Sequence, residues 1–497
     1  MSKYILAIDQ GTTASRAILI DENLKIAVSH GVDFPQYFPK PFWVEHNLNE
    51  IWNSVVTSVK HVLEIGKIDG SAIAAIGITN QRETTCLWEK NEAATPVHHA
   101  IVWQDRRTAD ICRKLRARGL EKTVNRTTGL LLDPYFSGTK LQWILENVTG
   151  AETRARKGKL AFGTIDSYLV YRLSGKHVTD PSNASRTLLM SLKTCEWDSD
   201  MLKLFKIPKA CLPKIMPSAT EYGRTSGVPH LPDGIPITGL SGDQQAALFG
   251  QACFTKGELK CTYGTGAFSL VNTGDTPIFS KHRLLTSVAW KLGDQTTYCL
   301  EGSAFIAGAA VQWIRDGLKL VHRSAESERL AESVPDSDGV LFVPALSGMG
   351  APHWLASATG LMTGLTRRTT KAHVARATLE GVAYQVRELL QAMGKDLGKK
   401  LLSIKVDGGA TANNLLMQFQ ADLLGAKVVR SKILETTALG AGLQAGLAIG
   451  FWKGLPDIKK RWQAAETFSP KMPNKQRNEL IAKWDRAMQA VKLLAGE

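Results

Sequence analysis

Two short apolar runs separated by a small polar turn open the chain. Residues 4–9 are apolar up to an aspartate, Gln10-Gly11-Thr12-Thr13 follows, and residues 16–21 are again mostly apolar. Runs of this length on either side of a glycine-containing turn are typical of a β-hairpin. The start of the chain is therefore predicted to form a strand, a tight turn and a second strand.

A similar unit returns in the second half of the chain. Residues 258–263 lead into Gly264-Thr265-Gly266, and residues 267–272 follow as another candidate strand. Recurrence of such a unit indicates an internal duplication. We predict two related domains, residues 1–250 and 251–497, each headed by one of the hairpins.

Mixed strand and helix patterns fill both halves and predict the α/β class. Residues 74–79 and 403–407 have the composition of strands, whereas residues 137–147, 374–393 and 415–423 carry apolar side chains at helical spacing.

A last apolar stripe lies near the C-terminus in a basic segment. At helical spacing it contains Leu480, Ile481, Trp484, Met488 and Val491. Such a stripe fits a terminal helix docked on the core or an amphipathic membrane anchor. We expect the docked helix.

Length and composition exclude a single small domain and global disorder. The chain has 497 residues, of which 44% are hydrophobic and 22% charged, enough for large cores in two or three domains. Lysine and arginine (61) outnumber aspartate and glutamate (46), which gives a net charge of +15. A basic field attracts nucleic acid, anionic lipid or phosphorylated small molecules alike. Because most cations are interleaved with acids, we interpret them as a solvated surface and expect no nucleic-acid partner.

The seven cysteines are far apart, without a Cys-x-x-Cys pair or a zinc-finger pattern. This usage fits a reducing compartment. No segment reaches the roughly 20 apolar residues of a membrane span. We expect a cytoplasmic protein with no membrane span.

The two Gly-Thr turns are candidates for holding phosphate. Backbone N–H groups and threonine hydroxyls in such a turn can donate hydrogen bonds to an anion. Thr12 and Thr13 occupy the first turn, Thr265 occupies the second, and Arg16 could add a cation. Ordinary hairpin connections, with Arg16 in a strand-face ion pair, are the alternative. Two such turns suggest a nucleotide phosphate held between the domains.

Two aspartates are candidates for phosphoryl-transfer chemistry. Asp9 ends the first strand, where it could hold Mg²⁺ or simply initiate the turn. Asp243 precedes an apolar helical pattern and could be a helix N-cap or a general base that takes a hydroxyl proton. The residues alone leave the two interpretations of Asp9 evenly balanced, whereas for Asp243 they favour the N-cap.

A glycine pair follows the strand predicted at residues 403–407. At Gly408-Gly409 a ribose or flat ring could approach bare backbone, and Asn413 could bond a base. An Asn-capped helix after a glycine turn explains the same residues. The sequence lacks P-loop, protein-kinase, dinucleotide-binding and α/β-hydrolase motifs.

Several segments, in this order along the chain, resemble the FGGY family of carbohydrate kinases, and within it the members that phosphorylate glycerol. The segments are 7–16, 77–85, Trp103-Gln104, 133–140, 242–247, 263–266 and 407–410, with signature-like stretches at 135–147 and 360–388. The resemblance covers residues 4 to about 450. It implies two actin-like, ribonuclease-H-like domains with the active site in the cleft between them.

For the substrate, the resemblance implies that Arg82 and Glu83 hydrogen-bond the hydroxyls of glycerol. The residues alone would suggest a surface ion pair. Tyr135 would bond another hydroxyl. In this family pattern Asp243 is the catalytic base and Gln244 is a neighbouring substrate contact.

Two further aromatic residues, Trp103 and Phe268, would form walls against the carbon chain of glycerol. Core packing is the alternative for both.

For the cofactors, the resemblance implies ATP/ADP and Mg²⁺, with Asp9 and Asp243 on the metal side. Ala14 stands where relatives often carry serine, so one hydroxyl contact to phosphate is absent. The implied nucleotide contacts are Thr12, Thr13, Ala14, Arg16, Thr265, Gly308, Gln312, Gly409 and Asn413.

The resemblance thus implies ATP-dependent phosphorylation of glycerol to sn-glycerol 3-phosphate, and we expect a homo-oligomer, either a dimer or a tetramer. Three alternatives remain: a kinase of a longer polyol or ketose, a non-catalytic actin- or chaperone-like nucleotide switch, and a nucleic-acid-binding module suggested by the charge of +15. Glycerol-dependent release of ADP would distinguish glycerol phosphorylation from the nucleotide switch and from the nucleic-acid-binding module.

Overall fold

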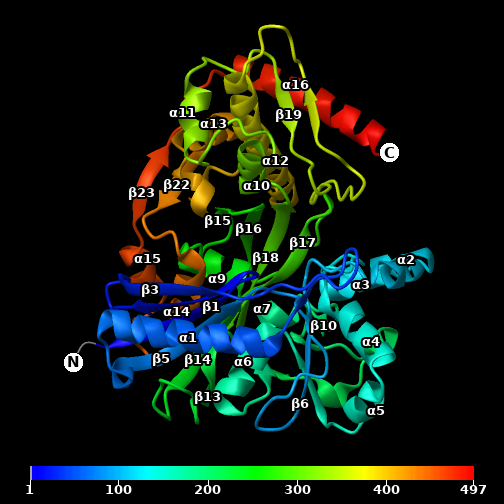
Figure 1. Ribbon diagram of the computed structural model, residues 1–497, viewed down its shortest axis with the longest axis vertical. Helices are drawn as coiled ribbons and strands as arrows, with labels where there is room; N and C mark the ends of the chain where they lie inside the picture. The colour runs from blue at the N-terminus through cyan, green and yellow to red at the C-terminus, as the bar shows by residue number, and fades with distance from the viewer. Residues whose placement is uncertain (1–2, 497) are drawn as a thin grey trace.

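The computed structural model describes residues 3–496 and contains a large mixed sheet in each half of the chain (Figure 1). The first sheet has the strand order β13-β14-β5-β1-β2-β3. Its strands are β1 (Tyr4–Gln10), β2 (Ala14–Ile20), β3 (Ile26–Asp33), β5 (Ile73–Asn80), β13 (Ala219–Arg224) and β14 (Pro236–Gly242).

The second sheet has the order β17-β18-β16-β15-β21-β22-β23. Its strands are β15 (Leu259–Tyr263), β16 (Ala267–Gly274), β17 (Leu285–Leu292), β18 (Gln295–Ala304), β21 (Ser403–Asp407), β22 (Lys427–Ser431) and β23 (Ala464–Phe468).

The two sheets repeat one topology. In each, an antiparallel hairpin (β1/β2 or β15/β16) extends to a third antiparallel strand (β3 or β18). The first strand of the hairpin also pairs in parallel with β5 or β21, and a second parallel strand and an antiparallel edge strand follow. Strand β17 is an addition to the second sheet. The predicted hairpins, the internal duplication and the α/β class are confirmed.

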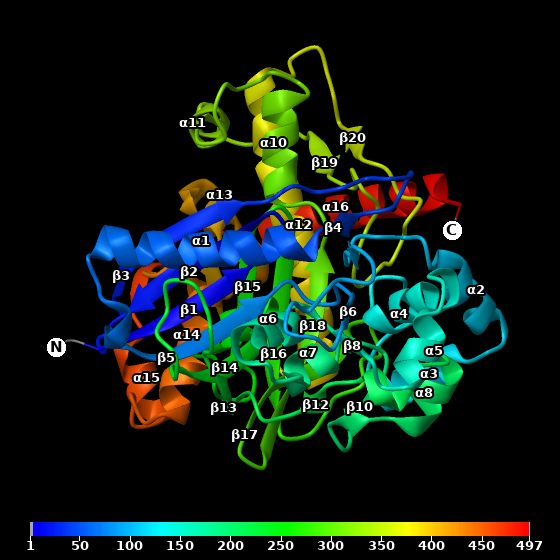
Figure 2. The same ribbon diagram turned by 60° about the horizontal axis from the view of Figure 1, so that its bottom comes forward.

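Helix α1 (Leu48–Gly66) lies across β2 and β3 of the first sheet (Figure 2). Its buried side chains include Ile51, Val55, Val59 and Val62, which recur every three or four residues and therefore share one helix face. The Asn47 side chain caps the helix by accepting a hydrogen bond from the Asn49 backbone N–H.

Helices of the second half pack around the long helix α12 (Lys371–Leu397), which contains the predicted helix at residues 374–393 (Figure 2). Helix α13 (Asn414–Leu424) contains the second predicted one. The C-terminal stripe lies on α16 (Asn474–Leu494), where Trp484, Met488 and Val491 are buried in the same core as α12. The prediction of a docked terminal helix is confirmed.

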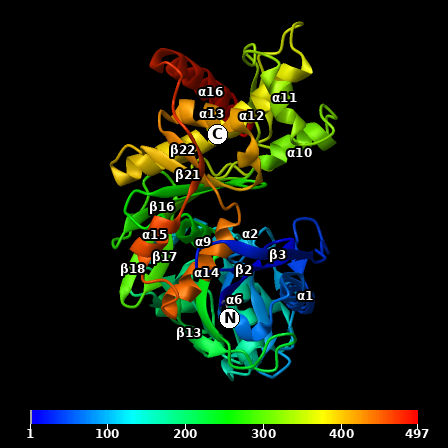
Figure 3. The ribbon, with the colours of Figure 1, turned by 90° about the vertical axis from the view of Figure 1, so that its left-hand side faces the viewer.

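Helix α14 (Thr436–Ala448) comes from the second half but packs on the first sheet and on α9 (Asp243–Gly250) (Figure 3). Glycines permit the close approach. A Cβ atom at Gly440 would overlap the Ala246 carbonyl oxygen of α9, and a Cβ atom at Gly239 would lie 2.6 Å from the Ala441 carbonyl oxygen. The contact between the two halves therefore depends on backbone packed directly against backbone.

The remaining elements cover the sheets or connect them. The helices are α2 (Ala109–Ala117), α3 (Glu121–Thr128), α4 (Ser137–Asn147), α5 (Ala151–Arg156), α6 (Ile165–Ser174), α7 (Pro181–Ala184), α8 (Ser199–Leu204), α10 (Gly308–Asp316), α11 (Glu326–Glu332) and α15 (Leu455–Arg461). The short strands are β4 (Glu45–His46), β6 (Cys86–Glu89), β7 (Ala100–Ile101), β8 (Leu160–Gly163), β9 (Val178–Thr179), β10 (Met190–Ser191), β11 (Glu196–Trp197), β12 (Lys214–Ile215), β19 (Leu341–Val343) and β20 (Leu361–Thr363). All seven cysteines are buried and free.

Candidate active site

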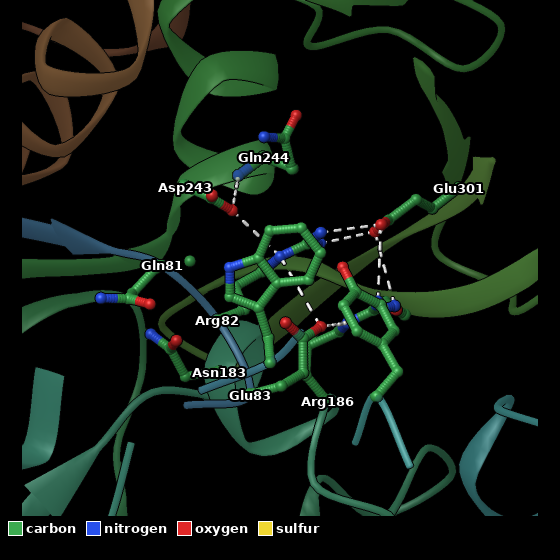
Figure 4. A network of polar contacts seen from close by, with 12 residues as sticks. Gln81, Arg82, Glu83, Asn183, Arg186, Asp243, Gln244 and Glu301 are labelled. Atoms are coloured by element: carbon green, nitrogen blue, oxygen red, sulfur yellow. Dashed lines mark hydrogen bonds and ion pairs between the residues drawn. The ribbon is translucent and has the colours of Figure 1, made fainter. Parts of the chain in front are cut away.

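Two arginines and two glutamates form a buried network where the halves of the chain meet (Figure 4). Arg82 donates from Nη1 to Glu301 Oε2 at 2.5 Å and from Nη2 to Glu301 Oε1 at 2.7 Å. Arg186 donates from Nε to Glu83 Oε1 at 2.6 Å, and its guanidinium lies 3.4 Å from Glu301. Uncompensated buried charge is costly, and here two positive and two negative side chains compensate one another.

Arg82 and Glu83 occupy the bend that follows β5. Glu83 has a φ of 61°, in the left-handed region that residues with a Cβ atom rarely adopt. Hydrogen bonds from the Thr85 and Ser137 hydroxyls to the Glu83 carbonyl, at 3.1 and 3.0 Å, hold this conformation. Arg82 is only 2% and Glu83 only 1% exposed, so the alternative of a surface ion pair is wrong.

The network controls the charge of its members. Burial acts to raise the pKa of Glu301, but Arg186 and Arg82 outweigh it and lower that pKa to about 2. For Glu83, burial outweighs the same two arginines and the pKa is raised. Burial acts to lower the pKa of Arg82, yet Glu301, Glu83 and Asp243 raise it well above its ordinary value. Arg82 and Glu301 therefore stay ionised at neutral pH.

Asp243 is the first residue of α9 and lies beside this network. Its Oδ1 atom is 3.0 Å from Arg82 Nε and accepts a hydrogen bond from the Gln244 backbone N–H at 2.6 Å. The N-cap position belongs to Gly242, so the N-cap interpretation of Asp243 is wrong by one residue. The Asp243 side chain is 30% exposed, which leaves its carboxylate accessible to a ligand. Within residues 3–496, the buried Arg82 Nε–H makes no hydrogen bond.

The Gln244 side chain points away from Arg82 (Figure 4). Its amide oxygen accepts a hydrogen bond from the Lys260 ammonium, which also donates to Thr262 Oγ1 at 2.9 Å. Burial lowers the pKa of Lys260, with Asp407 opposing the shift. Gln244 thus ties α9 to β15 of the second sheet, and its expected substrate contact stays a prediction.

An aromatic pair joins the network to the first turn. The rings of Trp103 and Tyr135 meet edge to face with centroids 5.5 Å apart, and the Arg186 guanidinium lies 5.5 Å from the Tyr135 ring. Trp103 donates from Nε1 to Thr12 Oγ1 at 3.0 Å. Burial raises the pKa of Tyr135, which keeps its hydroxyl protonated and able to donate a hydrogen bond. Both rings stay partly exposed rather than enclosed in the core.

Phe268 lies on β16, on the same face of the second sheet as Glu301. Phe268 pairs with Ser303 and Leu270 pairs with Glu301, so the side chains of these cross-strand partners point to one side. Phe268 is partly exposed.

In the turn between β1 and β2, Gly11 donates its N–H to the Ala14 carbonyl at 2.9 Å. Thr12 and Ala14 are partly exposed and Thr13 is exposed, so the turn is open to solvent. Arg16 forms an ion pair with Glu435, the residue that precedes α14. The structure therefore contains the ion pair considered for Arg16, although its partner comes from the other half of the chain.

Asp9 lies opposite Arg16 in the β1/β2 hairpin. Burial, followed by repulsion from Asp243 and Glu435, raises the pKa of Asp9 to about 7, against the attraction of Arg16. The region around Asp9 thus has an excess of carboxylates, which a bound cation would relieve.

The second turn is bound to the start of α10. Ala307 donates its backbone N–H to the Thr265 carbonyl at 2.8 Å, and Gly308 donates to the Gly264 carbonyl at 2.9 Å. Thr265 and Gln312 are exposed and Gly308 is partly exposed. The structure therefore brings Thr265 and Gly308 together, and Gln312 lies further along the same helix, α10.

The glycine pair after β21 lies against the same end of β15. Gly408 has a φ of 91°, and a Cβ atom there would be 2.5 Å from the Tyr263 carbonyl oxygen. Gly409 is exposed, and a Cβ atom there would meet nothing within 4 Å. Asn413 caps α13 by accepting a hydrogen bond from the Leu416 N–H at 2.8 Å, as in the capping alternative. This cap leaves the amide nitrogen of Asn413 available to donate.

Sequence reasoning missed Arg186 and Glu301. Glu301 is a single acid in the apolar run 298–302, and a lone buried charge of this kind signals a buried partner. Arg186 gave no such local signal.

Within the described residues, no helix combines the length and apolar character needed to cross a membrane. The same residues hold no group of three or more histidine, cysteine, aspartate or glutamate side chains arranged to bind a metal ion.

Models of two protein domains match the chain. The N-terminal domain of the FGGY family of carbohydrate kinases matches residues 4–250, and the C-terminal domain of that family matches residues 259–449.

Individual proteins match over the full length. Glycerol kinase of Myxococcus xanthus is 55% identical over 492 residues, which cover 98% of this chain and 99% of that protein. The crystal structure of Plasmodium falciparum glycerol kinase with ADP has a TM-score of 0.92 and 35% identity, covering 99% of this chain and 98% of that one. Gluconate kinase from Lactobacillus acidophilus has a TM-score of 0.89 and 26% identity, covering 100% and 99% of the two chains.

Proposed function

The chain belongs to the FGGY family of carbohydrate kinases, and from this premise we propose that it phosphorylates glycerol with ATP, giving sn-glycerol 3-phosphate and ADP. One observation carries the assignment of its active site. The accessible Asp243 carboxylate lies 3.0 Å from a buried arginine at the junction of the two halves. The proposed general base, Asp243, thus lies beside Arg82, the cation proposed to bind a hydroxyl.

The polyol would bind at the end of β5. The Arg82 Nε–H, which makes no hydrogen bond within residues 3–496, can donate to a hydroxyl, and Glu83 can accept from one. Tyr135 would donate to a further hydroxyl. Trp103 and Phe268 would contact the carbon chain, since both are partly exposed.

Asp243 would remove the proton of the attacking hydroxyl. The freed oxygen forms a bond to the γ-phosphorus of ATP while the bond from that phosphorus to the β,γ-bridging oxygen breaks, and ADP leaves. Arg82, held in place by Glu301, keeps the Asp243 carboxylate facing the substrate.

The nucleotide would lie between the two turns. Backbone N–H groups near Thr12, Thr13 and Ala14 of the first turn, and those near Thr265 of the second, would donate hydrogen bonds to its phosphates. Arg16 would exchange part of its pairing with Glu435 for phosphate. The bare backbone at Gly308 and Gly409, with Gln312 and Asn413, would contact the nucleoside.

The residues around Asp9 fit Mg²⁺. Mg²⁺ is commonly held by one or two carboxylates together with substrate phosphates rather than by an all-protein cage, in line with the absence of a preformed metal cluster in residues 3–496. Asp9 and Asp243 would hold it, because burial and then repulsion from Asp243 raise the pKa of Asp9, and a bound cation would relieve both. When bound, Mg²⁺ supplies positive charge to the phosphates.

A coupled assay of ADP release tests the proposal against its family rival, a kinase of a longer polyol or ketose. Glycerol, xylulose, gluconate and ribulose would be compared at equal concentration, since the fold is shared with a gluconate kinase. We expect release to depend on glycerol. Faster release with a longer substrate would assign the chain to the rival, and release with none of them would refute the kinase assignment.

Three finer expectations belong to the same proposal. The domains would divide near residue 250, the protein would be a dimer or tetramer, and it would act in the cytoplasm. Light scattering during size-exclusion chromatography would measure the oligomeric state, and limited proteolysis would test the domain division.

A further inference from the structure

A cavity of about 580 Å³ lies outside the candidate active site, between segments from both halves of the chain. The turn between β2 and β3 forms one wall, and the segment from the end of β22 to α14 forms another. The last residue of α15, Arg461, and the two residues after it form a third wall, and Arg461 donates to the Glu22 carbonyl of the β2–β3 turn at 3.1 Å. Small-molecule sites typically have volumes of about 300–1,000 Å³, so the space suits a compact organic ligand.

The lining combines an apolar interior with basic residues. Leu24, Ile26, Ile433, Leu434 and Leu439 supply apolar surface. The basic residues of the lining are Lys25, Lys432 and Arg461, and none of the lining residues, all within 3–496, is acidic. A ligand that complements this lining has an apolar body and a negative charge.

The positive charge of the two lysines is not neutralised by an ion pair among the described residues. Lys432 donates to the neutral Gln463 side chain at 3.0 Å, and Lys25 is exposed. Two carboxylates close to the lining in the sequence are engaged elsewhere. Asp457 pairs with Arg461 at 3.0 Å, and Asp21 accepts hydrogen bonds from backbone N–H groups of the β2–β3 turn.

Trp462 adds an aromatic side chain to the lining. Its indole N–H is shielded from solvent and has no hydrogen-bond partner within residues 3–496. The ammonium of Lys405 lies 4.1 Å from the centroid of the Trp462 ring and adds positive charge behind this wall.

We propose that this cavity binds a small amphiphilic anion, a carboxylate or phosphate monoester on a short aliphatic or aromatic body. The acidic head interacts with Lys25 and Lys432, and the body packs on the leucine and isoleucine side chains.

The cavity is connected to the candidate active site through one short segment. Ile433 and Leu434 line the cavity, and the next residue, Glu435, pairs with Arg16 of the first hairpin. A ligand that moves this segment therefore acts on Arg16 and on the charge around Asp9. This coupling rests on the proposed function, whereas binding itself does not.

The experiment titrates the full chain with octyl phosphate and octanoate by calorimetry, without ATP or glycerol. We expect one molecule of either anion per chain. Octanol has the alkyl chain without the anionic group, and inorganic phosphate has the anionic group without the chain. Each should bind at least tenfold more weakly than octyl phosphate. Equal binding of octanol would show that charge plays no part and would overturn the proposal.

Variants locate the site. The double variant Lys25→Gln, Lys432→Gln should weaken octyl phosphate binding at least tenfold, and so should Leu434→Glu, which places a carboxylate at a side chain that is 52% exposed. Lys460→Gln makes the same charge change on an exposed lysine of α15 outside the lining and should leave binding within twofold. Unchanged binding in both cavity variants would overturn the proposal.

The coupling has its own readout. Saturating octyl phosphate should change glycerol-dependent ADP release at least twofold in the unaltered chain but not in the double lysine variant. An unchanged rate despite binding would refute the coupling. If binding behaves as expected in a protein that releases no ADP with any polyol, the cavity site stands and the proposed function falls.

Discussion

Arg82 and Glu301 are 219 residues apart in the sequence, yet they form a two-pronged, fully buried ion pair that crosses from one half of the chain to the other. Arg82 also faces Asp243, so the ion pair connects the second sheet directly to the candidate catalytic carboxylate. Glu301 touches no proposed substrate atom and is a positioning residue.

Replacing Glu301 with glutamine should leave two buried arginines with one carboxylate fewer. We expect Glu301→Gln to lower the free energy of unfolding by about 3–5 kcal/mol, the usual cost of breaking a buried pair. Because the pKa of Glu301 is depressed from 4.5 to about 2, its stabilisation is present above pH 4.5 and is lost as the pH falls toward 2. Urea titrations between pH 3 and pH 7 would therefore show a smaller difference from the unaltered chain at the acidic end.

The exposed Glu92→Gln is the matched control and should change stability by less than about 0.5 kcal/mol. A Glu301→Gln protein as stable as this control would contradict the importance of the buried pair.

The base assignment predicts a specific kinetic loss. Asp243→Asn should lower kcat by about 10²–10⁴-fold while the dissociation constant of glycerol stays within about tenfold, because the amide keeps the shape but cannot accept the proton. Asp200→Asn, on a side chain that is 82% exposed, should leave kcat unchanged. Steady-state kinetics and glycerol titrations give both numbers, and near-normal turnover of Asp243→Asn would refute the assignment.

Asp9 should destabilise the protein at neutral pH. Its pKa is raised from 3.8 to about 7, so the unfolded chain releases the proton first and stability falls as the pH rises between these values. Asp9→Asn should remove this dependence and raise the free energy of unfolding at pH 7.5 by about 4 kcal/mol, while impairing Mg²⁺-dependent turnover. Denaturation at pH 4 and pH 7.5 measures the effect. If Asp9→Asn is no more stable than the unaltered chain at pH 7.5, the ionised Asp9 carboxylate does not destabilise the folded protein.

The hydrogen bond from Trp103 to Thr12 predicts energetic coupling between the proposed glycerol contact at Trp103 and the turn between β1 and β2. Trp103→Phe keeps an aromatic wall, and Thr12→Val keeps the size of the side chain. In a double-mutant cycle on kcat/KM we expect an interaction energy of about 1 kcal/mol. If the effects of the two substitutions on kcat/KM are additive, Trp103 and Thr12 act independently.

The close packing of α14 on α9 predicts that any side chain at Gly440 destabilises the protein. A methyl group there would overlap the Ala246 carbonyl, so Gly440→Ala should cost about 3 kcal/mol of stability. Gly409→Ala introduces the same methyl group into open space and should change stability by less than about 0.5 kcal/mol. Thermal unfolding of the two variants, compared side by side, tests the packing.

Local patterns predicted the elements well. The helix expected at residues 137–147 and the strand expected at 403–407 coincide with α4 and β21. The signals that begin and end such elements lie within a few residues, so they can be read without knowing the fold. The helix expected at 374–393 is longer in the structure, since packing in the second core extends it to Lys371–Leu397.

The site was less visible from the residues alone. Arg82 and Glu83 suggested a surface pair, because their burial depends on Glu301 and Arg186, which the chain brings close only after folding. The two Gly-Thr turns signalled anion binding, but their arrangement depends on a duplicated sheet topology that no short motif encodes.

The seven buried cysteines have a practical consequence. Burial raises the pKa of every one of these thiols, so the reactive thiolate form is scarce in the native protein. A maleimide dye would therefore find little to label until the chain opens. A single cysteine engineered at the exposed Leu434 could then carry a fluorophore without first removing the natural ones.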